Sequence, residues 1–420
     1  MKSLPIVQNL LKNTTTDFRF IPFGIVLIYL SLLLFSEFAL GSYAIIGNYF
    51  RIYPIPYFVD LEILLCGVDA IREGLDPYQA ICFEGEAYFN YPYIWGFLSV
   101  FPFMTAANHI AIGLIMAILF FALIYQFIGK INFKESLLYA LVFISPAVML
   151  GLERGNSDVL IFLILMSIPL LFYRSKWITS LLIIFTSFLK LFPIGAVVAL
   201  FLGKKESFRH KALLVGVTIV SLTLYVYFLL ENILQVSDKT PRPFKEASYG
   251  LGGFPSFIVD YFNVDMANRW VVFVSLGALL ILAFLVVIKT LKISIERYVI
   301  QEDKKGVAFF MGSGIFLFTC LIGYNWEYRL IFLIFTLPQL FSWLRQGLYL
   351  AKLITATYIF LVWCSLIVPV FNLFIPDGFA YVIIYNLTII LFLSFSMSYF
   401  KFLEAYYFAE FKSNSISIKP

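Results

Sequence analysis

The sequence predicts an all-α polytopic membrane protein, because its composition, its long apolar runs and the positions of its basic residues all indicate this class. Hydrophobic residues make up 61% of the 420 positions, whereas charged residues make up 13%. So few charges cannot cover a water-soluble surface, but lipid favours apolar side chains on every exposed helix face. By length we delimit about twelve hydrophobic segments and expect residues 1–420 to form a single integral membrane domain.

The first apolar run, at about residues 20–46, is too long for the core of a signal peptide and lacks a small-residue cleavage site. We therefore expect it to remain as a membrane span. Most of the 30 Lys and Arg residues fall in one set of loops, which this excess of basic charge places in the cytoplasm. The alternation of loops then puts both chain ends in the cytoplasm and leaves most acidic residues on the opposite face.

The first extracytoplasmic loop, residues 47–104, contains a predicted amphipathic helix over residues 61–73. Its apolar residues recur at helical spacing and its charged residues occupy the other side, which is typical of a helix lying on the membrane surface. Asp60 stands at the predicted N-terminus. It fits two compatible roles, as the cap of the helix or as a general base that the helix N-terminus keeps ionised.

The interval from Trp177 to Gly203 lies between two groups of basic residues but is too short for two full membrane crossings. Two short helices therefore have to turn back within it, and Lys190-Leu-Phe-Pro193 marks the turn. An ammonium group at that depth favours an anionic partner in a protein cavity. The alternative is that Lys190 extends to the outer interface and only anchors the hairpin.

Two further features of the outer loops leave alternatives open. Cys66 and Cys82 lie in the same outer segment, so a disulfide between them is geometrically feasible, but spacing alone does not establish it. The second long extracytoplasmic loop, residues 231–269, contains the glycine-rich stretch 250–257. It fits either a lid that closes over substrates or a passive connector.

Short motifs recur in a fixed order on the predicted outer face. Asp60 is followed by GVDAIREGLDPY at 67–78 and FNYPYIWGF at 89–97. Later come Glu153-Arg-Gly-Asn-Ser-Asp158, Lys190-Leu-Phe-Pro193 and Tyr324-Asn-Trp-Glu-Tyr-Arg329. Over about residues 60–340 this set resembles glycosyltransferase family 87, multipass enzymes of the GT-C fold that use polyprenyl-phosphate sugars. Arg154 and Asn156 depart from the glutamine-containing step that is more usual in the family.

The resemblance implies an enzyme that moves a sugar, by default mannose, from a polyprenyl-phosphate donor to a lipid or glycan hydroxyl, with inversion at the anomeric carbon. Asp60 would be the catalytic base, and Lys190, Arg154 and Arg329 would bind the donor phosphate. The residues implied for sugar or acceptor binding are Asp76, Tyr78, Asn90, Tyr91, Glu153, Asn156, Asn325 and Glu327. The scheme requires no metal or cofactor and places the site at the extracytoplasmic face of a prokaryotic plasma membrane.

Structural interpretations of the same residues remain open. Glu153, Arg154 and Asp158 fit mutual neutralisation within one turn, because local ion pairs are common at such turns. Glu327 and Arg329 fit a structural pair. The aromatic residues of the outer segment, namely Tyr78, Tyr91, Tyr93 and Trp95, fit an interfacial belt as well as a sugar platform.

Two other classes of function also remain open. A transporter or flippase of lipid-linked sugars would gather charge in a membrane cavity, but it would also show paired halves, which this sequence lacks. A non-catalytic assembly partner is the third class, and it predicts that Asp60 can be replaced with little effect. The net charge of +5 forms no stripe of the kind that binds nucleic acid.

Overall fold

The computed structural model describes residues 17–40, 57–82, 87–203, 206–240, 248–250, 300, 303–322, 325–367 and 379–403, and this part of the chain is mostly helical. The α-helices are α2 (Phe20–Leu40), α4 (Val59–Arg72), α5 (His109–Ile128), α6 (Phe133–Phe143), α7 (Pro146–Glu153), α8 (Ser157–Met166), α9 (Ile168–Leu171), α10 (Lys176–Leu189), α11 (Phe208–Phe228), α12 (Leu230–Lys239), α15 (Lys304–Ile322), α16 (Leu337–Arg345), α17 (Tyr349–Val362) and α19 (Phe379–Leu403).

Shorter elements complete the described part. The 3₁₀ helices are η1 (Pro77–Gln79), η2 (Tyr93–Val100), η3 (Ala106–Asn108), η4 (Phe192–Phe201) and η8 (Glu327–Thr336). Four two-residue strands form two antiparallel pairs, β1 (Ile81–Cys82) with β2 (Ala87–Tyr88) and β3 (Ser248–Tyr249) with β4 (Asn325–Trp326). The predicted all-α class is therefore confirmed for these residues, with two small strand pairs added.

Several helices are long and apolar enough to cross a membrane. Three pass on length and composition within the described residues, namely Ala106–Ile128, Phe208–Phe228 and Lys304–Ile322. The pair α6 and α7 counts as a fourth if its 53° bend lies within one span. Shorter apolar helices such as α8, α10 and α17 accompany them. The total of about twelve segments stays a prediction.

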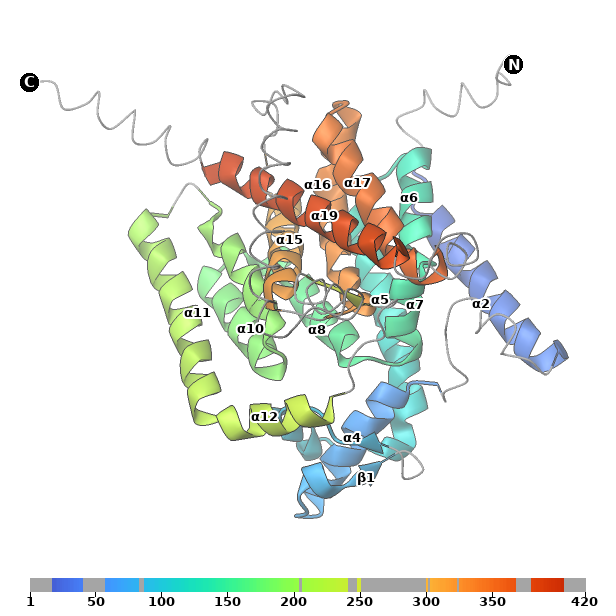
Figure 1. Cartoon of the computed structure of the whole chain (residues 1–420), viewed down its shortest axis with the longest axis vertical. Coiled ribbons are helices and arrows are strands. Elements are labelled where there is room, and N and C mark those ends of the chain that lie inside the picture. Colours follow the sequence, from blue (N-terminus) through green and yellow to red (C-terminus); the bar gives the residue numbers. More distant parts are fainter. Residues whose placement is uncertain are drawn as a thin grey trace, which may run out of the picture.

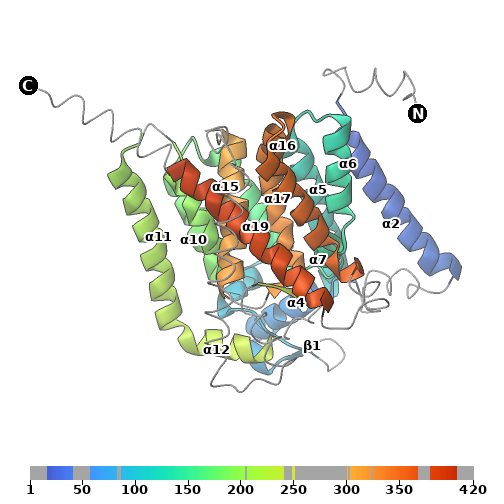
Figure 2. The ribbon, with the colours of Figure 1, turned by 45° about the horizontal axis from the view of Figure 1, so that its top comes forward.

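The long helices form a bundle, and smaller elements cover one of its ends. Figures 1 and 2 show α4, α12 and β1 together at that end, where α12 turns sharply away from the end of α11 and runs across the bundle. Helix α19 crosses in front of α15 and α17 and packs on both. This arrangement gathers segments far apart in the sequence around α4.

The predicted hairpin between Trp177 and Gly203 is confirmed, since α10 and η4 turn back on each other and Lys190 lies in the turn. The η4 arm packs tightly on α15. A Cβ atom added at Gly195 would collide with the backbone of Gly314, and the converse also holds. Small residues of this kind let two helices of a membrane protein approach at the backbone.

Helix α4 begins one residue before Asp60, which corrects the predicted capping role. The cap position is Phe58, with a left-handed φ of 60°, and no side chain caps the helix by a hydrogen bond. The predicted apolar face exists, but protein covers it: Leu64, Leu65 and Val68 are buried against the neighbouring outer segment and α5. The helix is therefore docked on the protein through the face that was expected to lie on the membrane.

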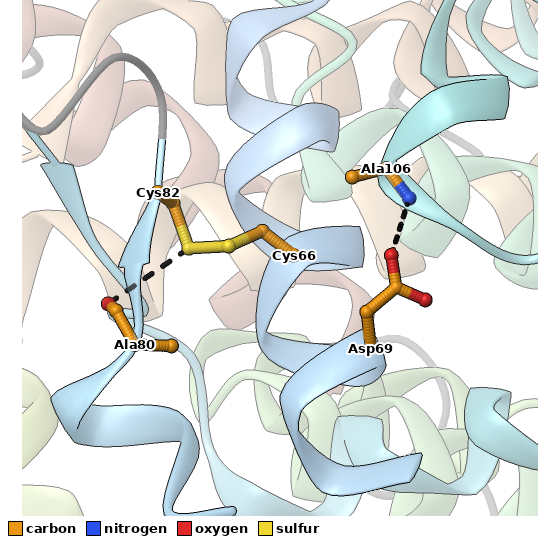
Figure 3. Close-up of a disulfide and its surroundings, with 5 residues drawn as sticks. All are labelled: Cys66, Asp69, Ala80, Cys82 and Ala106. Carbon is orange, nitrogen blue, oxygen red and sulfur yellow. Dashed lines mark hydrogen bonds between the residues drawn. A yellow bond between two sulfur atoms is a disulfide. The ribbon is translucent and has the colours of Figure 1, made fainter. Parts of the chain in front are cut away.

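A disulfide between Cys66 and Cys82 joins α4 to β1, with the two Cα atoms 5.9 Å apart (Figure 3). On the other side of the same helix, the Asp69 carboxylate accepts a hydrogen bond of 2.8 Å from the backbone N–H of Ala106. The open question about the cysteines is thus answered by a disulfide that fixes α4 within the outer segment.

The predicted second outer loop begins with α12, whose Asn232, Ile233, Val236 and Lys239 are half-buried. Their spacing places them on one helix face, which is the face that lies against the protein. The glycine-rich stretch 250–257 lies, after Gly250, outside the described residues.

Candidate functional site

A cavity of about 270 Å³ lies where α4, the α10–η4 turn, α12 and the start of η8 meet. Its charged lining, among the described residues, consists of three cations and one carboxylate. The lining residues are Asp60, Asn90, Tyr91, Pro92, Arg154, Asn156, Phe188, Lys190, Leu191, Phe192, Tyr225, Ile233, Val236, Thr240, Ile322, Trp326, Tyr328 and Arg329. The cavity thus has both charged and apolar residues in its lining.

Asp60 is held by the turn between α7 and α8. The Arg154 guanidinium binds its carboxylate through both oxygens, with Nε 3.0 Å from Oδ2 and Nη2 2.5 Å from Oδ1. The Asn156 amide donates a third hydrogen bond of 2.6 Å to Oδ2. Backbone contacts support this geometry, because the N–H of Asp60 donates to the Arg154 carbonyl at 2.9 Å and that of Phe58 donates to the Glu153 carbonyl at 2.7 Å.

Asp158 forms a second charged cluster with Lys190 and Arg329. The Lys190 Nζ lies 2.5 Å from Oδ1 of Asp158, and the Arg329 Nε lies 3.3 Å from Oδ2. Asp158 is only 1% exposed and sits in the first turn of α8, where the helix N-terminus favours a negative charge. Lys190 thus has a buried carboxylate as its anionic partner, which favours the interpretation as a cavity residue over that as a simple interface anchor.

Asn156 connects the two clusters. Its Nδ2 donates to Asp60, while its Oδ1 accepts from the backbone N–H of Asp158 at 2.9 Å and lies 3.4 Å from the Lys190 Nζ. Both ends of the amide are therefore used, which fixes the orientation of the side chain. The Lys190 ammonium also lies 5.6 Å from the centre of the Tyr91 ring.

Seven of the residues implied by the motifs line the cavity, namely Asp60, Asn90, Tyr91, Arg154, Asn156, Lys190 and Arg329. The other five lie around it. Glu153 ends α7 beside Arg154, and Glu327 is buried in the first turn of η8. Asn325 is buried and accepts a hydrogen bond from the Arg329 guanidinium.

Asp76 and Tyr78 support the cavity wall from outside. Asp76 caps η1 by accepting from the backbone N–H of Tyr78 at 3.0 Å. The Tyr78 hydroxyl donates to the Tyr91 carbonyl at 3.1 Å, and the Tyr91 hydroxyl donates to the Asp60 carbonyl at 3.1 Å. Burial, reinforced by the nearby Asp76 charge, raises the pKa of Tyr78 to about 12, so its hydroxyl remains a donor at neutral pH.

The ion pairs of the site join distant residues and differ from the pairs within one turn that the sequence analysis left open. Arg154 pairs with Asp60 rather than with its neighbours in the turn, and the defined partners of Arg329 are Asp158 and Asn325. Trp95 is fully buried and donates to the Leu189 carbonyl at 3.1 Å, so it ties the outer segment to the α10 hairpin. It is neither an interfacial residue nor part of the cavity lining.

Sequence reasoning missed two features of the site. Asp158 was considered only as a local charge of the turn, although a carboxylate directly before an apolar run is a signal of a functional cluster. Trp326 and Tyr328 were not considered, although both line the cavity beside Arg329.

No group of three His, Cys, Asp or Glu suited to a metal ion occurs among the described residues.

No protein-family model matches this chain, and comparisons with curated proteins and with solved structures find no match either.

Proposed function

We propose that this chain is a membrane glycosyltransferase of the GT-C fold that transfers a sugar from a polyprenyl-phosphate donor to a lipid or glycan hydroxyl at the extracytoplasmic face. The observation that carries the proposal is the convergence of Asp60, Arg154, Lys190 and Arg329 on one cavity. The choice of mannose rests on the resemblance to glycosyltransferase family 87.

The charge of the cavity supports an anionic ligand. Three cations and one carboxylate line it, and Asp158 behind them still leaves an excess of positive charge over the two clusters. Fixed cations in a partly desolvated site stabilise a phosphate more strongly than they would in water. The donor phosphate would therefore bind near Lys190 and Arg329 and leave with its negative charge compensated.

The apolar part of the cavity lining supports a lipid-linked donor. It includes Ile233 and Val236 of α12, Ile322 at the end of α15 and Leu191 of the hairpin turn. Their side chains suit the first isoprenoid units of a polyprenyl chain, since contact with them removes apolar surface from water. A soluble nucleotide sugar would gain nothing from this wall.

In the proposed reaction, the acceptor oxygen attacks the anomeric carbon from the side opposite to the phosphate. The bond between that carbon and the phosphate oxygen breaks, the acceptor proton passes to Asp60, and polyprenyl phosphate departs. Glycosyl transfer of this kind has a transition state with carbocation character, so the acceptor hydroxyl becomes acidic as the attack proceeds. A carboxylate that Arg154 and Asn156 hold in one orientation suffices as the base.

The disulfide fits the proposed side of the membrane. Disulfides form and persist in oxidising compartments and are rare in the cytosol. Cys66 lies on α4, the helix that contributes Asp60 to the cavity. The pairing therefore supports an extracytoplasmic position for α4 and the cavity beside it.

The test is sugar transfer from synthetic polyprenyl-phosphate mannose by purified protein in nanodiscs, followed by mass spectrometry of the products. We expect Asp60→Asn to lose at least about a hundredfold of the rate, because general-base catalysis contributes roughly 10² to 10⁴. Glu73→Gln is the matched control, because it removes an exposed carboxylate at the end of the same helix.

Two results would contradict the proposal. Equal transfer by Asp60→Asn and wild type would remove Asp60 from catalysis. Translocation of a fluorescent lipid-linked sugar across proteoliposomes, without any transfer, would favour a flippase instead.

A further inference from the structure

The cavity contains a phenol group that the proposed chemistry has not yet used. Tyr328 lines the cavity and is 7% exposed. Among the described residues no hydrogen bond to its hydroxyl occurs, and this oxygen is not one of the fully buried atoms that lack a partner, so it is accessible from the cavity. A phenol has an apolar ring and a polar O–H group that usually finds a hydrogen-bond partner, so an accessible O–H group at a cavity wall is suited to bind a ligand there.

Other tyrosines around the site show the usual arrangement. The hydroxyl of Tyr78 donates to a carbonyl of the outer segment, and so does that of Tyr91. The Tyr225 hydroxyl donates to the Phe188 carbonyl at 2.8 Å. Each of these phenols is committed to holding backbone in place, whereas that of Tyr328 is available to a ligand.

The Tyr328 ring is held in position by its neighbours. It stacks on the indole of Trp326, with 5.9 Å between ring centres and 13° between planes. Trp326 belongs to β4, which is paired with β3. The paired backbone next to Tyr328 and the stacked indole together fix the orientation of the ring. The hydroxyl therefore points in a defined direction even though it forms no hydrogen bond.

The surroundings of Tyr328 define the chemistry of the ligand. The phenol shares the cavity lining with Arg329, Asp60 and Arg154, and it lies within electrostatic reach of these groups and of Asp158. It therefore lies near members of both charged clusters, in a site with excess positive charge. A neutral O–H donor at this position suits an anionic oxygen, because hydrogen bonds to charged groups are the strong ones.

We infer that Tyr328 binds the donor by donating a hydrogen bond from its hydroxyl to an oxygen of the phosphate, beside Lys190 and Arg329. This inference rests on the proposed function. In this role Tyr328 contributes to ground-state binding of the phosphate. The cations contribute charge, whereas the single phenol O–H group contributes a hydrogen bond of defined direction.

The experiment measures binding of farnesyl phosphate, a short polyprenyl monophosphate, by isothermal titration calorimetry to the full chain in detergent. We expect Tyr328→Phe to raise Kd about tenfold or more, because it deletes one hydrogen bond to a charged group and keeps the ring. Farnesol, which lacks the phosphate, should bind both proteins equally. Tyr227→Phe is the matched control, since Tyr227 is 75% exposed on α11.

The outcomes separate this inference from the proposed function. Equal affinity of wild type and Tyr328→Phe for farnesyl phosphate would overturn the inference and leave the donor class intact. A wild type that does not bind farnesyl phosphate at millimolar concentration would overturn both. Thermal unfolding supplies a further check, because a hydroxyl without a protein partner can be removed at little cost. A large loss of stability in Tyr328→Phe would show a structural role instead.

Discussion

Replacing Asp158 with asparagine should destabilise the protein strongly, because Asp158 is the shared partner of two cations. With an effective dielectric constant of about 20, its attraction to Lys190 at 2.5 Å is about 7 kcal/mol, and that to Arg329 at 3.3 Å is about 5 kcal/mol. The cost of removing all three charges from water offsets much of this gain. Deleting one partner of a buried pair nevertheless costs about 3–5 kcal/mol, because the remaining charge stays buried without compensation.

We expect Asp158→Asn to reach the upper part of that range, since two cations lose their partner at once. This corresponds to a fall in the folding equilibrium constant of more than two powers of ten. The assay is reversible unfolding in mixed detergent and dodecyl sulfate micelles, followed by circular dichroism. Asp17→Asn is the control, because the Asp17–Arg19 pair is about a quarter exposed on both sides and should contribute only about 0.2–1 kcal/mol.

The reasoning would be refuted by a change of less than about 1 kcal/mol for Asp158→Asn, equal to the surface control. Such a result would mean that water reaches Lys190 and Arg329 and solvates them without the carboxylate. A double variant, Asp158→Asn with Lys190→Met, refines the test. It should recover part of the lost stability, because it removes one of the two uncompensated charges.

Two further predictions concern the scaffold around the site. Gly195→Ala places a methyl group against the backbone of Gly314 and should cost about 1–3 kcal/mol or more in the same unfolding assay. Gly216→Ala is its control, because a Cβ there meets nothing within 4 Å, and equal effects of the two would argue against close η4–α15 packing. The chain has four cysteines, so denatured protein should bind two maleimide groups before reduction and four after it. Cys66→Ser should lower the free energy of unfolding by about 3 kcal/mol, given the length of the loop that the disulfide closes. Four labels before reduction would contradict the disulfide.

The sequence predicted the local elements of the fold better than their partners. The apolar spacing of α4 identified its buried face correctly, but periodicity does not say whether lipid or protein covers that face. Asp60 was placed at the cap because Asp is favoured there, yet the helix starts at Val59. The backbone hydrogen bonds from α4 to the α7–α8 turn, which no local pattern encodes, decide that boundary.

The same limit applies to the candidate site. The hairpin at Lys190 and its need for an anion followed from span length and from the cost of a charge in the membrane. The identity of that anion could not be predicted in this way. Asp158 lies 32 residues before Lys190, and Arg329, the other partner of Asp158, lies 171 residues after Asp158. Pairing between such distant residues depends on how the helices pack, and local sequence favoured pairs within one turn instead.

The close contact between Gly195 and Gly314 has a consequence for how the cavity changes shape. Two backbones in direct contact leave no compressible side chain between them, so η4 and α15 should move together as one rigid unit. Lys190, two residues before η4, should then keep its position relative to α15. For the proposed transferase, α12 is the part of the cavity wall more suited to move, because it has no buried residue and contributes Ile233 and Val236, although Lys239 bonds its end to the Tyr78 carbonyl. If the chain is the proposed transferase, we expect movement of α12 to control the entry and release of substrates, while the cations of the cavity remain in place.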